Sequence, residues 1–537
     1  MYKKHAARLL ACLLLASLTA GAALAAEPPG RLAQTLESTV RLCLTPPHEF
    51  DPAARARLDD FYRRHDYQRV WTSRRQIDEL LRQLEALADD GIDPTVYQPQ
   101  QIRAQLQAKH REPLASDCAD ILASHAYLLA LRHLLQGRLE QDRFEPVWRS
   151  PDAAAQETVR LRLLEIADAG LAKPEQAFDQ ARPGMEPYHN LRNAYARLRR
   201  STPASEPWPQ IAAGPTLRPG MHDPRVPLLR QRLLRTGHLP PDQPTVTPSD
   251  HFDPALVTAL QAFQLQHSLE ADGLLGRQTL AALNTHPFER LGQLRVNLER
   301  FRWLAREVEP ESLLVDIAAG RVIYFQAGKA RWEARGQVGR LTRRTPGIKS
   351  SVTRLTLNPT WTIPPTILRE DKLPLIQQDI GYLARNQLQV IDAQGNLLDP
   401  YQVDWDNPRG IMLRQAAGPD NPLGRVAIRF ANPHAIYLHD TPSQALFAHP
   451  LRAFSSGCVR VESIMQLVEL LLTDSERQRV TTLLESGQTH EFRLSRPMPI
   501  LLAYWTAHAD ARGQPRYRPD IYQQDAALLA ALEDSRP

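Results

Sequence analysis

A cysteine and a histidine that could act together lie close in the C-terminal half of the chain, at Cys458 and His439. A thiol attacks a carbonyl as its thiolate, and an imidazole within hydrogen-bond reach can take its proton. His434 and His449 are rivals for this role, but each stands next to a proline, outside a regular pattern. We therefore take Cys458 as the candidate nucleophile and His439 as the candidate general acid and base. The alternative is a buried thiol and a structural histidine.

The residues from Ala435 to His439 alternate between apolar and polar types, which predicts a β-strand. Tyr437 and His439 would share one face of it. The alternation resumes after the cysteine, so Cys458 and Arg460 are expected to point to one side. Tyr437 and Arg460 are candidate substrate-binding residues in the same cleft. Packing of the tyrosine, and an ion pair between the arginine and a carboxylate, are the alternatives.

Small residues lead into the cysteine, in the order Ser455, Ser456, Gly457. Because no bulky side chain blocks the backbone there, its N–H groups can approach a ligand closely. We predict an oxyanion hole formed by the N–H groups of Cys458 and Gly457, with Ser456 as a further donor. Ser463 is predicted to cap a helix that anchors this loop.

Four blocks of sequence occur in a recognisable order. They are VGRLTRRTPGIKS (338–350), NPTWTIPPTI (358–367), NPLGRVAIRF (421–430), and the stretch from Tyr437 to Arg460, with H-D-T-P and S-S-G-C-V-R. Together they resemble the L,D-transpeptidase (YkuD-type) catalytic domain of bacterial cell-wall enzymes, in its larger variety with an S-S-G-C signature. Commoner members carry S-H-G-C, so we interpret Ser456 as a mark of the subfamily.

The resemblance implies a reaction on peptidoglycan. Cys458 would attack the carbonyl of the third residue of a tetrapeptide stem, D-alanine would leave, and an amine of a second stem would take the acyl group in a 3→3 cross-link. His439 would be oriented by the backbone carbonyl of Asp440, with the Asp440 carboxylate as a rival. Trp361 would lie near the substrate cleft, the alternative being a core tryptophan. Carbapenems would acylate the thiol.

No metal or nucleotide cofactor is required by this chemistry. The sequence contains no H-E-x-x-H, paired C-x-x-C or phosphate-binding glycine loop. Two other functions stay open. One is a non-catalytic wall-binding protein, which the departure at Ser456 would support. The other keeps the acyl-enzyme but uses water or a lipoprotein amine as acceptor, as an L,D-carboxypeptidase or an anchoring transferase. Other cell-wall synthesis proteins are possible partners.

The first 25 residues have the pattern of a signal peptide. Three cations precede an apolar run over residues 9–25 that ends in Ala-Leu-Ala, and the run is shorter than the roughly 20 residues of a membrane span. This predicts export to the periplasm. Removal of residues 1–25 lowers the formal net charge from +5 to +2. The remaining arginines are interspersed with acids, so we expect no nucleic-acid partner.

The cysteines are consistent with an exported chain. Of the four, Cys12 would leave with the signal peptide and Cys458 is assigned to chemistry. Cys43 and Cys118 remain as a possible disulfide. Two buried free thiols are the alternative.

At 537 residues the chain is too long for one core. Residues 27–205 have helical spacing and predict a scaffold domain. Residues 217–286 resemble a three-helix peptidoglycan-binding domain, whose role as a sugar binder or as a brace is open. Residues 311–496 are rich in short β segments and form the predicted catalytic domain, with a capping insertion at about 368–412. Residues 497–537 are predicted to pack back on it. The expected fold class is therefore multidomain α+β.

Overall fold

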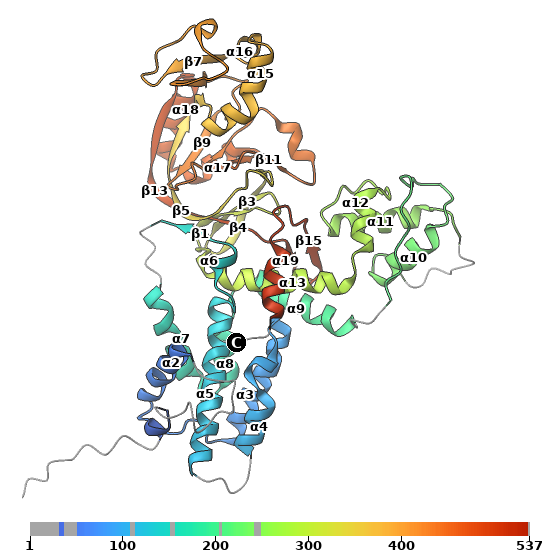
Figure 1. Cartoon of the computed structure of the whole chain (residues 1–537), viewed down its shortest axis with the longest axis vertical. Coiled ribbons are helices and arrows are strands. Elements are labelled where there is room, and N and C mark those ends of the chain that lie inside the picture. The colour runs from blue at the N-terminus through green and yellow to red at the C-terminus, as the bar shows by residue number, and fades with distance from the viewer. Residues whose placement is uncertain are drawn as a thin grey trace, which may run out of the picture.

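The computed structural model describes residues 32–36, 51–107, 113–150, 156–202, 207–240 and 249–534. The predicted signal peptide and Cys43 lie outside these residues. Three lobes are visible in Figure 1, with a helical bundle at one end, a β-rich domain at the other and a small helical bundle to one side. They meet around α13 (Pro287–Leu304). The multidomain arrangement predicted from the sequence is confirmed.

The first lobe is a helical bundle with its own apolar core. In α3, the residues Ile77, Leu80, Leu81 and Leu84 follow the i, i+3, i+4, i+7 spacing of a core-facing stripe and are all buried. The elements are α2 (Pro52–Arg63), α3 (Arg74–Ala86), η1 (Leu87–Asp90), η2 (Pro94–Tyr97), α4 (Pro99–Gln107), α5 (Pro113–Gln136), α6 (Gln141–Phe144), α7 (Gln156–Gly170), α8 (Pro174–Ala181) and α9 (Glu186–Ser201).

Helix α5 is long and apolar enough to cross a membrane by length and composition. Of its most apolar window, 78% is buried inside the protein. Burial in the core of the bundle therefore accounts for its hydrophobicity. Cys118 is one of its buried residues, and its predicted pairing with Cys43 stays a prediction.

The second lobe is a small bundle whose helices start at clear signals. The Asp253 carboxylate accepts a hydrogen bond of 2.9 Å from the Leu256 N–H, and Pro254 occupies the first turn of α11. Apolar residues at helical spacing, which include Val226, Leu229, Leu256 and Leu260, form its core. The helices are α10 (Val226–Arg235), α11 (Pro254–Gln266) and α12 (Arg277–Asn284).

The third lobe is built on a sheet that closes on itself. The strand order is β1-β5-β13-β2-β3-β4-β12-β10-β9, and β9 also pairs with β5. Alternating apolar residues fill the interior. The elements are β1 (Val147–Arg149), β2 (Ser312–Asp316), β3 (Arg321–Gln326), β4 (Lys329–Gly339), β5 (Gly347–Leu357), β9 (Val426–Phe430), β10 (Leu438–His439), η6 (Gln444–Ala448), β11 (Ala453–Ser455), β12 (Val459–Val461), α17 (Ile464–Leu471), α18 (Asp474–Glu485) and β13 (His490–Ala503).

The capping insertion forms a subdomain with its own core. Its three-stranded sheet has the order β6-β8-β7, and it lies at the far end of the β-rich lobe in Figure 1. Because β6 and β8 belong to this sheet, the subdomain extends beyond 368–412 on both sides. The elements are β6 (Trp361–Thr362), α14 (Pro365–Ile367), the π-helical turn η4 (Leu368–Lys372), α15 (Leu373–Gln378), α16 (Gly381–Arg385), β7 (Leu388–Asp392), η5 (Pro400–Gln402) and β8 (Ile411–Gln415).

Two strands cross the domain boundaries expected from the sequence. Strand β13 continues through position 496, pairing antiparallel with β5 and parallel with β2. Strand β1 comes from the helical region and pairs parallel with β5. The last elements are η3 (Ala305–Glu307), β14 (Ala507–Ala509), β15 (Pro515–Tyr517) and α19 (Asp525–Glu533). Helix α19 packs on α13, so the C-terminal segment contacts the junction of the lobes.

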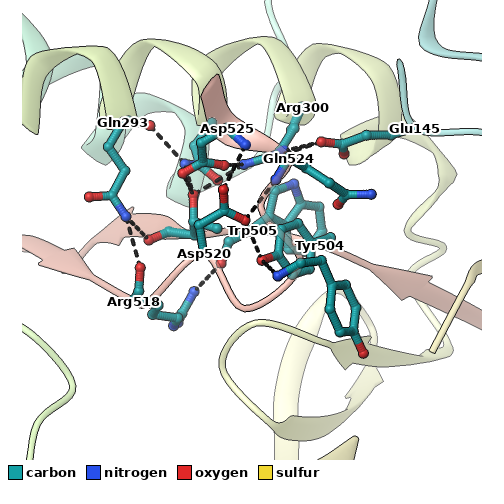
Figure 2. Close-up of polar contacts among 12 residues, drawn as sticks. Glu145, Gln293, Arg300, Tyr504, Trp505, Arg518, Asp520, Gln524 and Asp525 are labelled. Carbon is teal, nitrogen blue, oxygen red and sulfur yellow. Dashed lines mark hydrogen bonds and ion pairs between the residues drawn. The ribbon is translucent and has the colours of Figure 1, made fainter. Parts of the chain in front are cut away.

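A buried arginine joins three parts of the chain at this junction (Figure 2). Arg300 on α13 is fully buried, and its guanidinium lies 2.6 Å from the carboxylates of both Glu145 and Asp525. Thr506 accepts a bond of 3.1 Å from the same guanidinium and donates one of 2.8 Å to Asp525. The helical scaffold, α13 and the C-terminal segment thus share one network.

Arg300→Met is expected to weaken this junction strongly. The substitution leaves the carboxylates of Glu145 and Asp525 buried without their cation, and breaking one side of a buried pair costs about 3–5 kcal/mol. A lower urea midpoint of unfolding measures the effect. As a control, Arg496→Ala removes an exposed partner of Glu311 and should shift the midpoint little. Equal midpoints for the two variants would contradict the prediction.

Candidate active site

The site is organised by two short parallel strands, β10 and β12. Leu438 pairs with Val459, and His439 pairs with Arg460. The Val459 N–H donates to the Tyr437 carbonyl at 3.1 Å. Since Leu438, Val459 and Val461 are completely buried, the alternate residues turn to the other face. The pairing therefore brings Cys458 beside Tyr437.

The tyrosine and the histidine share a face, as the alternation predicted. Their ring centroids are 5.5 Å apart. The strand itself is shorter than expected, because Ala435 takes a left-handed φ of 53° and ends the extended backbone. The expected cap at Ser463 is wrong: this residue also has positive φ, of 52°, and its side chain makes no capping hydrogen bond.

His439 is buried, with 4% of its surface exposed. Its Nδ1 lies 2.5 Å from the Asp440 carbonyl oxygen, which fits an Nδ1–H donor, and the Pro422 carbonyl also contacts the ring. The Asp440 carboxylate instead accepts from the Arg425 N–H at 2.9 Å. Of the two orienting groups considered from the sequence, the carbonyl is thus the one that contacts the imidazole.

The resting thiol and imidazole are both neutral. Burial raises the pKa of the Cys458 thiol, against the opposing effects of Tyr437 and of two arginines, Arg429 and Arg460. The thiol donates to the Ala435 carbonyl at 3.7 Å. Burial, assisted by the charge of Arg460, lowers the pKa of His439 to about 3. The histidine is therefore an uncharged base above this pH, and the thiol loses its proton only when it attacks.

Alkylation of Cys458 by iodoacetamide should accordingly rise with pH through the whole neutral range. Only the thiolate reacts, and the raised pKa keeps its fraction small, so the rate should increase about tenfold per pH unit from pH 6 to 8. Mass spectrometry of quenched samples gives the rate. A plateau within this range would instead indicate a resting thiolate–imidazolium pair.

Arg429 is a site residue that the sequence reasoning missed. It lies on β9, and its guanidinium carbon stands 4.0 Å from the centroid of the Tyr437 ring, a cation–π distance. Its Nε donates to Thr356 Oγ1 at 3.1 Å. The alternation in VAIRF could have indicated it, because Arg429 stands between the buried Ile428 and Phe430 and so faces out of the core.

The loop before the cysteine is held by its own hydrogen bonds. Gly457 has a φ of 116°, and its N–H donates to Ser455 Oγ at 3.1 Å. Ser455 Oγ in turn donates to the Cys458 carbonyl at 2.5 Å. In this conformation the Gly457 N–H is thus used within the loop, and its oxyanion role stays a prediction.

A cavity of about 410 Å³ lies between the cap and this loop. Ser456 and Arg460 line it from the loop side, and Trp361 lines it from the cap. Arg460 donates to Gln337 Oε1 at 3.2 Å, while its Nε is buried without a partner. Glu462, the sequence alternative as its partner, pairs instead with Arg335.

The other predicted residues lie in different surroundings. Trp361 is half-buried, and the Lys372 ammonium lies 5.8 Å from the centroid of its ring; it lines the cavity and also packs against the core of the cap. His434 and His449 are exposed, and His449 packs edge-on against Phe454. Cys118 lies in the helical scaffold. Thus Cys458, Tyr437, His439, Ser456 and Arg460 are grouped by the fold.

Three family models match the chain in this order. Residues 56–194 match a scaffold domain, residues 222–283 a “Putative peptidoglycan binding domain” and residues 310–482 an L,D-transpeptidase catalytic domain. The chain is thus similar, segment by segment, to a scaffold domain, a peptidoglycan-binding domain and an L,D-transpeptidase catalytic domain.

One relative is a Haemophilus influenzae protein (strain ATCC 51907 / DSM 11121 / KW20 / Rd) named “Putative L,D-transpeptidase”. It is 35% identical over 284 residues, covering 50% of this chain and 57% of the relative. The chain therefore matches just over half the length of that protein.

Two solved structures were also found. An L,D-transpeptidase from Xylanimonas cellulosilytica DSM 15894 has 16% identity and a TM-score of 0.16, over 56% of this chain and 100% of that one. A fused Zn-dependent amidase/peptidase/peptidoglycan-binding protein from Clostridium acetobutylicum ATCC 824 has 11% identity and a TM-score of 0.14, over 54% and 100%.

Proposed function

We propose that the chain forms 3→3 cross-links in peptidoglycan from tetrapeptide donor stems. The supporting observation is the pairing of β10 with β12, which places the Tyr437 phenol beside both the Cys458 thiol and the neutral imidazole, with Arg460 next in line on the cavity. A nucleophile with an adjacent base oriented by a third group is the arrangement that covalent acyl transfer uses. Here the groups are Cys458, His439 and the Asp440 carbonyl.

In the first half-reaction, Cys458 Sγ attacks the carbonyl carbon of the third residue of the donor stem. The thiol proton passes to His439 Nε2, and the carbonyl oxygen becomes negative. When the intermediate collapses, the C–N bond to D-alanine breaks and the proton moves from His439 to the departing amine. A thioester remains on Cys458. The charges of Arg429 and Arg460, which already favour the thiolate, would also stabilise the oxyanion.

In the second half-reaction, the side-chain amine of another stem attacks the thioester. His439 accepts a proton from this amine, the new C–N bond forms, and the C–S bond breaks with return of the proton to the sulfur. The product joins the third residues of two stems. The imidazole is uncharged before this step, and its low pKa means that the protonated ring passes the proton readily to the sulfur.

The remaining domains fit an enzyme of the cell wall. We place its action in the periplasm after loss of residues 1–25, with the domain at 222–283 holding it to peptidoglycan. Carbapenems would acylate Cys458 as donor mimics. Peptidoglycan stems would serve as both donor and acceptor.

Mass spectrometry of products from disaccharide-tetrapeptide tests the proposal. Protein lacking residues 1–25 should give dimers that have lost one D-alanine. Tripeptide alone would indicate an L,D-carboxypeptidase, and coupling only to an added lysine peptide would indicate an anchoring transferase. Absence of every thiol-dependent product would favour a non-catalytic binding protein.

A further inference from the structure

Two arginines join the cap to the segment beside the nucleophile loop: Arg340 lies 3.3 Å from Asp371, and Arg343 makes the closer contacts. Arg343 lies between β4 and β5, and its side chain is only 10% exposed. Its guanidinium contacts both oxygens of Asp371, at 2.6 and 2.8 Å, and Glu370 Oε2 at 2.7 Å. Both carboxylates belong to the π-helical turn η4 of the cap. Bidentate, charge-assisted bonds of this kind are strong and directional.

The same guanidinium reaches the nucleophile loop. Arg343 Nη1 donates to Ser456 Oγ at 3.0 Å, two residues before Cys458. The Ser456 hydroxyl and the cap carboxylates therefore share one guanidinium.

The segment that carries Arg343 also supports the rest of this loop. Thr345 Oγ1 donates to the Gly457 carbonyl at 2.7 Å and accepts from the Gly339 N–H at 2.8 Å. The Arg340 N–H donates to the Ser455 carbonyl at 3.0 Å. The hydrogen bonds of residues 339–345 thus stabilise the nucleophile loop, and Arg343 of the same segment also contacts the cap.

We propose that Arg343 is a positioning residue that couples closure of the cap to the conformation of the nucleophile loop. The inference rests on the proposed function and names a determinant of the same site. When Glu370 and Asp371 contact Arg343, the cap stays over the cavity that Asp371, Ser456 and Arg460 line. When these carboxylates separate from Arg343, the cap is free to move away from the cavity. The guanidinium that donates to Ser456 then loses the two carboxylates that fix its position. Turns of the π type are rare and often occur where a protein functions.

Access to the thiol tests the coupling without requiring turnover. Cys458 is labelled in the full chain with iodoacetamide, which is small, and with fluorescein maleimide, which is bulky, and the site is identified by peptide mass spectrometry. Arg343→Ala should raise the bulky rate about tenfold and change the small rate less than about twofold. Joint Glu370→Gln and Asp371→Asn, which also removes the Arg340–Asp371 pair, should raise the bulky rate at least as much, and Arg343→Ala on that background should add nothing further.

Two more variants separate positioning from general damage. In Arg343→Lys the rate of labelling by fluorescein maleimide should return only part of the way to the wild-type value. The ammonium keeps the charge but cannot make the two parallel hydrogen bonds of a guanidinium. Ser456→Ala keeps the ion pairs with the cap, so the labelling ratio should stay at the wild-type value. Its kcat for cross-linking should fall about threefold or more, with KM unchanged.

Arg354→Ala is the matched control, because it removes an exposed pair with Glu491 at 3.7 Å far from the cap contacts. Wild-type bulky labelling in both Arg343→Ala and the carboxamide pair would overturn the coupling, as would an equal increase in Arg354→Ala. If labelling follows the expectation while the wild type makes no cross-links, the coupling holds and the proposed function fails.

Discussion

Cys458→Ala is expected to abolish cross-linking and to remove the covalent carbapenem adduct. The described part of the chain holds one free cysteine, Cys458, and the proposed thioester needs its sulfur. We expect cross-linking to fall by at least about 10⁴-fold, as when a covalent nucleophile is deleted. Intact-mass measurement after incubation with a carbapenem should show an adduct on the wild type alone.

The folding control for this variant is direct. The cysteine is half-buried, so its loss creates only a small void, and the thermal midpoint should stay within about 4 °C of the wild type. Cys458→Ser, which keeps the shape but offers a poorer nucleophile, should also lose the adduct. An adduct that persists in Cys458→Ala would place the acylated group elsewhere and contradict the assignment.

His439→Gln is expected to lower kcat for cross-linking by about 10²–10⁴-fold, the usual contribution of a positioned general acid and base. The glutamine cannot carry the proton from the thiol to the leaving amine. Both the single-turnover acylation rate and the transfer to the acceptor should fall, since the same imidazole serves both steps. Rapid-quench mass spectrometry of the acyl-enzyme separates the two rates.

Asp440→Asn is the matched control for the histidine. The imidazole contacts the backbone carbonyl of Asp440, whereas the carboxylate contacts the Arg425 N–H, which an amide oxygen can also accept. The variant should therefore lose no more than about threefold in kcat. A loss as large as that of His439→Gln would show that the carboxylate orients or charges the imidazole.

The burial of His439 also determines whether its contribution to folding stability rises or falls with pH. Its folded-state pKa of about 3 lies below the unfolded value, so the unfolded chain binds more protons between these two pKa values. The stability that the neutral ring contributes is complete above the unfolded pKa and is lost as pH falls towards about 3. Activity measured above about pH 4 should consequently show no acid limb from this residue.

The sequence by itself determined which groups can react. The residue types at Cys458 and His439, and the alternation around them, were enough to predict a thiol, an imidazole and a tyrosine on one working face. The helical stripes of the second lobe, with Val226, Leu229 and Leu256 buried, were likewise readable. Such features depend on periodicity within one element, which neighbouring residues encode directly.

Only the tertiary structure decided how the reactive groups are surrounded. The stacking of Arg429 on Tyr437 depends on the register between β9 and β10. The choice of the Asp440 carbonyl over its carboxylate, and the use of the Gly457 N–H within its loop, depend on backbone angles that alternation does not specify. The contact of Arg343 with Asp371 joins a loop to an insertion. These contacts link segments that the chain brings together only on folding, so no local pattern contains them.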